Sequence, residues 1–132
     1  MNLTKHRKTA SSLTISQKLL GKMVALIKSG RFSSISDIVN VSVSIFIGKL
    51  SVYEIDSEFS YSAFIALYQE DDTPREKVSV SYSEYLNEEL ERLSKLIKKN
   101  KSFLVRAALS NFFDFHVNNT ARFEKSQNDE NG

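Results

Sequence analysis

The chain has 132 residues, of which 18 are basic and 16 acidic, and it has no cysteine. That length allows one domain or two very small ones. The lack of cysteine excludes a disulfide framework and a thiolate metal site, and it is typical of the reducing cytoplasm. No apolar run approaches the ~20 residues that a membrane-spanning helix needs, so we expect no membrane partner. The N-terminus is basic but no apolar h-region follows it, so we expect no secretory signal peptide.

Charge is distributed unevenly along the sequence. Residues 1–49 carry a net charge of +7, residues 50–74 carry −6, and residues 75–132 carry +1. Basic residues stand before both candidate strands, which suits a polyanion because neutralised phosphates release counterions. The residues expected to contact the phosphates of such a polyanion are Lys5, Arg7, Lys8 and Arg75. For the first three, an ordinary solvated tail is the alternative.

The first half of the chain has the pattern of a strand followed by two helices. Weak alternation over residues 9–15 predicts a short strand. Ser16 can cap the helix that follows, and Gly30 suits the left-handed position after its end. The next helix opens with the capping-box sequence Ser34-Ile35-Ser36-Asp37. It is apolar around most of its circumference, which predicts burial against several partners.

The second half repeats this pattern after an acidic linker. The linker is apolar enough for a short helix that packs on the core, and Pro74 ends it. Alternation over residues 78–82 is cleaner than in the first strand. Ser83 can start the next helix, and Asn100 or Ser102 can cap the last one. The expected segments are a flexible basic arm (1–8), a first motif (9–50), the linker (51–75), a second motif (76–117) and a disordered tail (118–132).

The two motifs stay in step with each other along the sequence. Tyr82 corresponds to Ile15 in the strands, and Phe112 corresponds to Phe46 in the final helices, with one position lost in the break between the helices. A motif of this size cannot bury much surface alone, so the two should share one core. Antiparallel pairing of the strands at 11–15 and 78–82 would satisfy backbone groups that a lone strand leaves open. The expected fold class is therefore mainly α with a small antiparallel β-ribbon.

Alternation divides the predicted ribbon into two faces. The apolar face, which should enter the core, carries Leu13, Ile15, Val78, Val80 and Tyr82. The other face carries short polar side chains and a lysine, and a two-stranded ribbon fits the major groove of DNA. The residues expected to contact bases are Ala10, Ser12, Thr14, Lys77, Ser79 and Ser81. Helix N-termini near Ser34 and Asn100 would offer N–H groups to phosphate.

At these residues the chain resembles the Arc/MetJ-like ribbon-helix-helix family of DNA-binding regulators. In the first motif the resemblance rests on Leu13-Thr14-Ile15-Ser16, Gly30-Arg31-Phe32-Ser33-Ser34 and Ser36-Asp37-Ile38-Val39. In the second it rests on Lys77-Val78-Ser79-Val80-Ser81-Tyr82-Ser83 and Ser102-Phe103-Leu104-Val105-Arg106-Ala107-Ala108-Leu109. It implies a sequence-specific transcriptional regulator, such as a repressor, that binds double-stranded DNA. The phosphate contacts it implies at the helix starts fall on Ser33, Ser34, Asn100 and Lys101.

Two features depart from the usual family pattern. The family forms its fold from two chains, whereas here both halves stand in one. This tandem form resembles small regulators of archaeal viruses, which implies an intramolecular pseudo-dimer in the host cytoplasm, with self-association along DNA as a further option. Ala10 stands where a polar base-reading residue is usual, and Ser11 stands where an apolar residue is usual. Base reading is therefore expected to differ between the halves.

Two other functions remain open. One is an antitoxin-type autoregulator whose tail binds a partner protein, although the tail after Asn118 lacks the apolar anchors that a partner helix needs. The other is a helical protein-interaction module that does not bind DNA, with Ser and Thr forming an ordinary solvated surface. An enzyme is not expected, because the sequence has no nucleophile motif, metal-ligand spacing or glycine-rich phosphate loop. No cofactor or small-molecule substrate is implied.

Overall fold

The computed structural model describes residues 8–52 and 68–117, with side chains for 10–49 and 68–117. Their elements are β1 (Lys8–Ser16), α1 (Gln17–Lys28), α2 (Ile35–Val52), β2 (Arg75–Ser83), α4 (Glu84–Ile97), α5 (Lys101–Phe112) and a π-helical turn, η2 (Phe113–Val117). The fold is mostly helical with a two-stranded antiparallel sheet, which confirms the expected class at that level. The short helix expected in the linker and the tail from 118 onward lie outside the described residues.

The two strands pair with each other as the alternation predicted. β1 runs antiparallel to β2, with Ser12 opposite Ser79 and Leu13 opposite Val78. Both strands are longer than expected, because they begin at Lys8 and Arg75. These two positions had been assigned to the basic arm and to the linker. The same pairing register continues past the apolar positions to the strand ends, since backbone N–H and C=O groups there still find partners across the ribbon.

The inner face of the ribbon is apolar and enters the core. Leu13, Ile15, Val80 and Tyr82 are each at most 1% exposed, while Val78 is only half-buried. Burial of this one face determines the register, because a slip by one residue would turn the apolar side chains toward water. The division of the ribbon into two faces therefore follows the sequence pattern.

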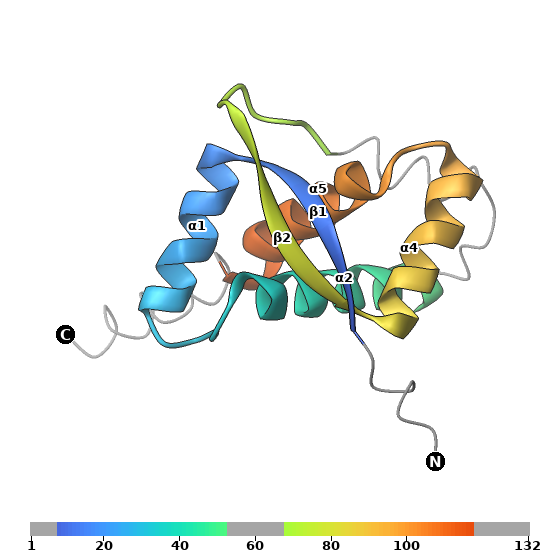
Figure 1. The fold of residues 1–132 in the computed structure, drawn as a ribbon, viewed down its shortest axis with the longest axis horizontal. Coiled ribbons are helices and arrows are strands. Elements are labelled where there is room, and N and C mark those ends of the chain that lie inside the picture. Colours follow the sequence, from blue (N-terminus) through green and yellow to red (C-terminus); the bar gives the residue numbers. More distant parts are fainter. Residues whose placement is uncertain (1–7, 53–67, 118–132) are drawn as a thin grey trace, which may run out of the picture.

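The helices form a layer behind the ribbon. Figure 1 shows the strands crossing one face of the molecule, with α2 and α5 behind them and α1 and α4 on either side. α2 packs against both α5 and β2, and α5 also packs against β1. Each motif thus contributes one strand, one flanking helix and one central helix to a shared core.

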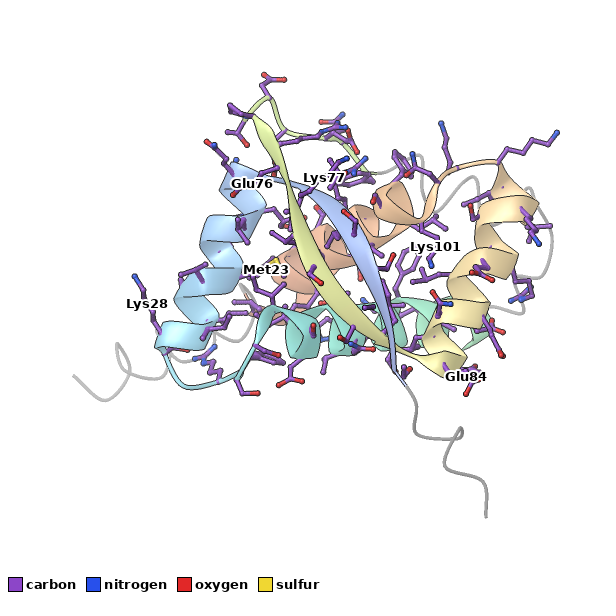
Figure 2. The ribbon with its side chains drawn as sticks, viewed as in Figure 1. Met23, Lys28, Glu76, Lys77, Glu84 and Lys101 are labelled. Atoms are coloured by element: carbon purple, nitrogen blue, oxygen red, sulfur yellow. The ribbon has the colours of Figure 1, made fainter. Side chains whose placement is uncertain are left out.

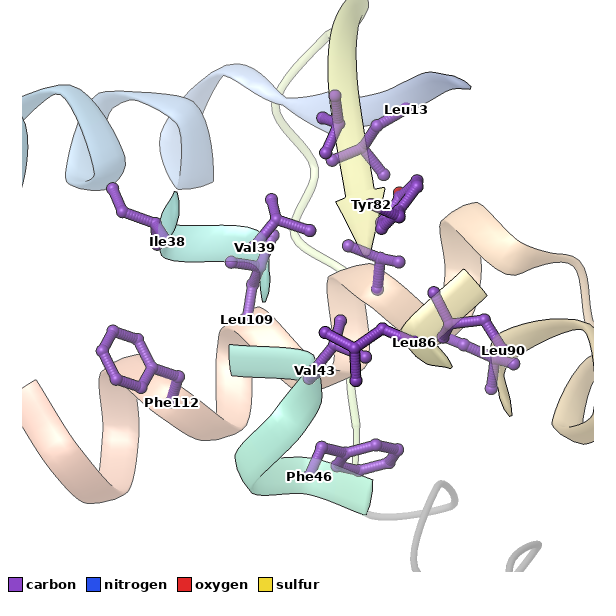
Figure 3. Packing of buried hydrophobic residues seen from close by; sticks show 14 of the residues in the cluster. Leu13, Ile38, Val39, Val43, Phe46, Tyr82, Leu86, Leu90, Leu109 and Phe112 are labelled. Carbon is purple, nitrogen blue, oxygen red and sulfur yellow. The ribbon is translucent and has the colours of Figure 1, made fainter. Parts of the chain in front are cut away.

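The core joins side chains from both motifs into one cluster. Ile38, Val39 and Val43 of α2 lie near Leu109 of α5, beneath the ribbon residues Leu13 and Tyr82 (Figure 3). Further along the two central helices, the aromatic side chains at equivalent positions of the repeat are buried, since Phe46 is 3% and Phe112 is 6% exposed. Burial of such apolar side chains is the main term that stabilises the fold.

Short polar side chains begin the helices at the expected positions. The hydroxyls of Ser16 and Ser83 accept hydrogen bonds from the third backbone N–H of α1 and α4, and the Asn100 side chain does the same for α5. Gly30 follows α1 with a φ of 82°, the left-handed conformation that glycine adopts without a steric penalty. Lys98 ends α4 in the same region, with a φ of 59°. These caps define where the ribbon passes into helix.

Candidate nucleic-acid interface

The outward face of the ribbon holds all six residues that the sequence assigned to base contacts. Thr14 and Ser81 are half-buried, and the other four are exposed. Lys77 lies in β2 opposite Thr14, near the upper end of the ribbon in Figure 2. A shallow depression on the ribbon is lined by Ala10, Ser11, Ser12, Lys77, Val78 and Ser79. The structure therefore brings the predicted positions onto one accessible surface.

The centre of this face is a pair of serines. Ser12 of β1 lies directly opposite Ser79 of β2, and the two also occupy equivalent positions in the two sequence repeats. Each serine of this cross-strand pair is therefore the repeat equivalent of the residue that it faces. The flanking pairs on the outward face are Ala10 with Ser81 and Thr14 with Lys77.

The two ends of the face carry different side chains. The same correspondence makes Thr14 equivalent to Ser81 and Ala10 equivalent to Lys77. Thr14 and Ser81 both bear a hydroxyl. Ala10 and Lys77 are both exposed, but one ends in a methyl group and the other in an ammonium group. The two ends of this face therefore differ chemically at that pair.

Helix α2 binds the outer edge of β2 through two polar side chains. The Ser36 hydroxyl accepts a hydrogen bond from the backbone N–H of Ser81 at 3.0 Å. The Asn40 amide donates to the Ser81 carbonyl at 2.7 Å, and its oxygen accepts from the Ser83 N–H at 3.0 Å. Backbone groups that would otherwise lack a partner on this edge are thereby satisfied by one turn of helix.

Helix α5 binds the outer edge of β1 in the corresponding way. The Ser102 hydroxyl accepts from the backbone N–H of Thr14 at 3.2 Å, and Arg106 Nη1 donates to the Thr14 carbonyl at 2.8 Å. In the repeat, Ser102 corresponds to Ser36 and Arg106 corresponds to Asn40. None of these four residues was expected to contact the ribbon, although Ser102 was a candidate cap. The signal that could have found them is a serine followed one helical turn later by a hydrogen-bond donor, at the same place in both motifs.

At the start of α2, the predicted phosphate contacts take part in capping. Ser34 Oγ accepts from the backbone N–H of Asp37 at 3.1 Å, as the capping-box sequence predicted. Ser33 is exposed, and its hydroxyl donates to the Asp37 carboxylate. That carboxylate already complements the positive end of the helix dipole. An incoming phosphate would therefore have to share this helix start with a negative charge.

At the start of α5, the two predicted phosphate contacts differ in how they are held. The side-chain oxygen of Asn100 accepts from the Phe103 N–H at 2.8 Å. The Lys101 ammonium donates to Asn87, and it lies 5.4 Å from the centre of the Tyr82 ring. Burial raises the pKa of Tyr82 to about 12, so this ring is neutral near pH 7. Lys101 is thus turned toward α4 by partners within the chain, as Figure 2 shows.

Arg75 also has a partner that the sequence did not reveal. Its guanidinium forms an ion pair with the carboxylate of Glu70, just before β2. The same carboxylate accepts from Arg106 Nε at 2.7 Å. A phosphate contact by Arg75 would therefore compete with Glu70. The sequence signal that could have indicated this partner is the acidic run that starts at Glu70, because it directly precedes the strand.

The rest of this acidic run binds the start of α1. The Ser16 hydroxyl donates to the Asp71 carboxylate at 2.6 Å, and the backbone N–H of Thr73 donates to the same group at 2.9 Å. These hydrogen bonds hold the pKa of Asp71 below its usual value. The N–H groups of Gln17 and Lys18 donate to the Pro74 carbonyl and to the Thr73 hydroxyl. The segment before β2 therefore occupies the N-terminus of α1.

The N-terminal basic residues are only partly covered by the structure. Lys5 and Arg7 lie outside the described residues. Lys8 is the first residue of β1, opposite Ser83, so its backbone belongs to the ribbon. Its backbone therefore lies at one end of the ribbon that carries the outward face described above.

Two other kinds of site are absent from the described residues. Within residues 8–52 and 68–117, no helix is both long and apolar enough to cross a membrane. The same part of the chain contains no cluster of three or more histidine, cysteine, aspartate or glutamate side chains able to hold a metal ion.

Comparison of the chain with protein-family models, with curated proteins and with solved structures gave no match.

Proposed function

We propose that this chain is a sequence-specific DNA-binding regulator of transcription, built from two ribbon-helix-helix motifs that form a pseudo-dimer within one chain. In this proposal the ribbon enters the major groove, and its outward side chains contact base edges. The observation that carries it is the accessible face centred on Ser12 and Ser79, which holds hydroxyls and one lysine. Such groups hydrogen-bond base edges in the major groove, which admits a two-stranded ribbon.

The pseudo-dimer rests on two supporting observations. The strands that pair come from the two repeats of one chain. The bonds from Ser36 and Asn40 to β2 correspond to those from Ser102 and Arg106 to β1, at equivalent positions of the repeat. Each central helix thus binds the strand of the other motif. The resemblance to the ribbon-helix-helix family supplies the expectation that this arrangement binds DNA.

Binding of the full chain to duplex DNA tests the proposal directly. A duplex should first be selected from a library with a randomised centre, and its affinity compared with that of a scrambled duplex across a salt series. We expect tighter binding to the selected duplex. We also expect log K to fall with log salt by ~0.9 for each phosphate contact.

A matched pair of variants locates the surface. Ser79→Asp adds a negative charge at the centre of the ribbon face, and Ser44→Asp adds the same charge at an exposed position on α2. We expect the first to abolish duplex binding and the second to retain most of it. Equal affinity of the two variants, or no salt-dependent binding by the unaltered chain, contradicts the proposal.

A further inference from the structure

We propose that the ribbon binds a non-palindromic DNA site in a single orientation, and that Lys77 determines this orientation. The inference rests on the proposed function, because it concerns how the same ribbon face is used. A pseudo-twofold relationship between the two motifs would by itself allow two opposite orientations on DNA. The side chains on the outward face decide whether these orientations are equivalent.

One pair of equivalent positions on the outward face differs in hydrogen-bonding capacity. Ser12 and Ser79 are equivalent positions of the repeat, and both are serine. Thr14 and Ser81 are also equivalent, and both present hydroxyls. Ala10 and Lys77 are equivalent, exposed and chemically different. Of these outward positions, only this pair differs in hydrogen-bonding capacity.

Lys77 is available to make a contact that Ala10 cannot. Among the described residues it forms no hydrogen bond or ion pair, unlike Lys101 and Arg75. A lysine ammonium donates well to the O6 and N7 atoms of guanine, whereas an alanine methyl can only contact the methyl of thymine. A guanine under one end of the ribbon would therefore favour the orientation that brings Lys77 to it.

The flanks of the two ends are bound by different side chains. Beside Thr14, which faces Lys77, the edge is bound by the guanidinium of Arg106, and Arg106 is held by Glu70. Beside Ser81, which faces Ala10, the edge is bound by the neutral amide of Asn40. Because Arg106 is only 5% exposed and its charge is balanced by Glu70, Lys77 remains the group that distinguishes the two half-sites.

The lack of cysteine makes the orientation directly measurable. Lys18 in α1 and Tyr85 in α4 are exposed and occupy equivalent positions of the repeat, and they follow opposite ends of the ribbon. The variants Lys18→Cys and Tyr85→Cys can each carry an iron chelate that cleaves nearby DNA. On the selected duplex, we expect each probe to cut one flank only, and the two probes to cut opposite flanks.

The role of Lys77 is tested by moving the lysine to its equivalent position. In each probe background, the double change Ala10→Lys with Lys77→Ala should exchange the flanks that are cut on the same duplex. Lys77→Ala alone should make each probe cut both flanks, and Lys77→Arg should retain the original pattern. Circular dichroism of each variant verifies the fold.

Three outcomes overturn the inference. Cutting of both flanks by both probes in the unaltered background would mean that the two orientations are equivalent. One-sided cutting that persists after the lysine is moved would mean that another residue sets the orientation. Failure to select any duplex would remove the proposed function itself, and this outcome is distinguishable because it gives no cutting at all.

Discussion

Arg106 and Glu70 are joined by two contacts of 2.7 Å, from Nε and Nη2 of the guanidinium to one carboxylate oxygen. Arg106 is only 5% exposed, and its third contact is the donor bond to the Thr14 carbonyl. One buried side chain therefore connects α5, the edge of β1 and the acidic segment before β2.

Removal of this guanidinium should destabilise the fold. We expect Arg106→Ala to lower the free energy of unfolding by about 3 kcal/mol, because it leaves the Glu70 carboxylate partly buried with a partner missing. Glu70→Gln, which retains an acceptor for Arg106, should cost less. Urea unfolding followed by circular dichroism measures both. A loss below ~1 kcal/mol for Arg106→Ala would mean that the contact is a weak surface ion pair.

The two buried aromatic residues of the central helices should contribute comparably to stability. Phe112 packs edge-on against Phe32 with ring centres 5.9 Å apart, and Phe46 is buried in α2. Either one changed to alanine should cost ~3–5 kcal/mol, the range for emptying a buried aromatic site. Phe115→Ala is the control, since that ring is 57% exposed. A loss under ~1 kcal/mol at Phe46 or Phe112 would show that the residue is not part of the core.

The Ser42 hydroxyl is buried and has no hydrogen-bond partner among residues 8–52 and 68–117. The equivalent residue of the second motif is Ala108, which is also buried. We expect Ser42→Ala to raise the free energy of unfolding by about 1 kcal/mol more than Ser44→Ala does, because it removes an unsatisfied polar group. The exposed Ser44 corrects for the higher helix propensity of alanine. Equal effects at the two serines would mean that the Ser42 hydroxyl is satisfied in solution.

Asp71 should contribute to stability in a pH-dependent way. Its pKa is lowered by the hydrogen bonds from Ser16 and Thr73. The contribution is therefore complete above the unfolded-state pKa of ~3.9 and is lost as the pH falls through the lower folded-state value. Urea unfolding from about pH 6 to about pH 2.5 should show a steeper acid loss for the unaltered chain than for Asp71→Asn. Parallel curves would contradict the assignment.

Two lysines should affect DNA binding differently if the ribbon face reads bases. Lys77→Ala should cost ~1–3 kcal/mol on the selected duplex and little on a scrambled one, as expected for a lost bidentate base contact. Lys8→Ala should weaken binding to both duplexes alike and reduce the salt slope by about one unit for each lost phosphate contact. Titration of both variants across a salt series measures these effects. Equal loss on both duplexes for Lys77→Ala would exclude a base-reading role.

The parts of this fold that could be predicted are those encoded in short-range patterns. Alternation over 78–82 predicted the buried face of β2, and the in-step repeat predicted its partner strand. Ser16 and Ser83 were predicted as caps, and Asn100 was one of two candidates, because a helix start needs a side-chain acceptor close to its first free N–H groups. The alternation and the caps depend on residues that are close together in sequence, and the repeat depends on a match between two such local patterns.

The parts that could not be predicted depend on contacts between distant residues. Arg106 meets the carbonyl of Thr14, which lies in the other motif, and no local spacing indicates that partner. Arg75 was expected to contact phosphate because basic residues precede both strands, but Glu70 binds it. Lys101 was likewise expected to contact phosphate at the helix start. Its ammonium instead donates to Asn87 of α4 and lies over the ring of Tyr82. A residue's charge alone does not reveal what already neutralises it.

The side chains bound to the ribbon edges also bear on solubility. A two-stranded sheet has two outer edges, and unpaired backbone groups on an edge invite pairing with strands of other molecules. An incoming strand would have to displace Ser102 and Arg106 from Thr14, or Ser36 and Asn40 from Ser81. The central helices thus obstruct growth of the sheet by recruitment of further chains, and a variant that loses these bonds should be more prone to aggregate.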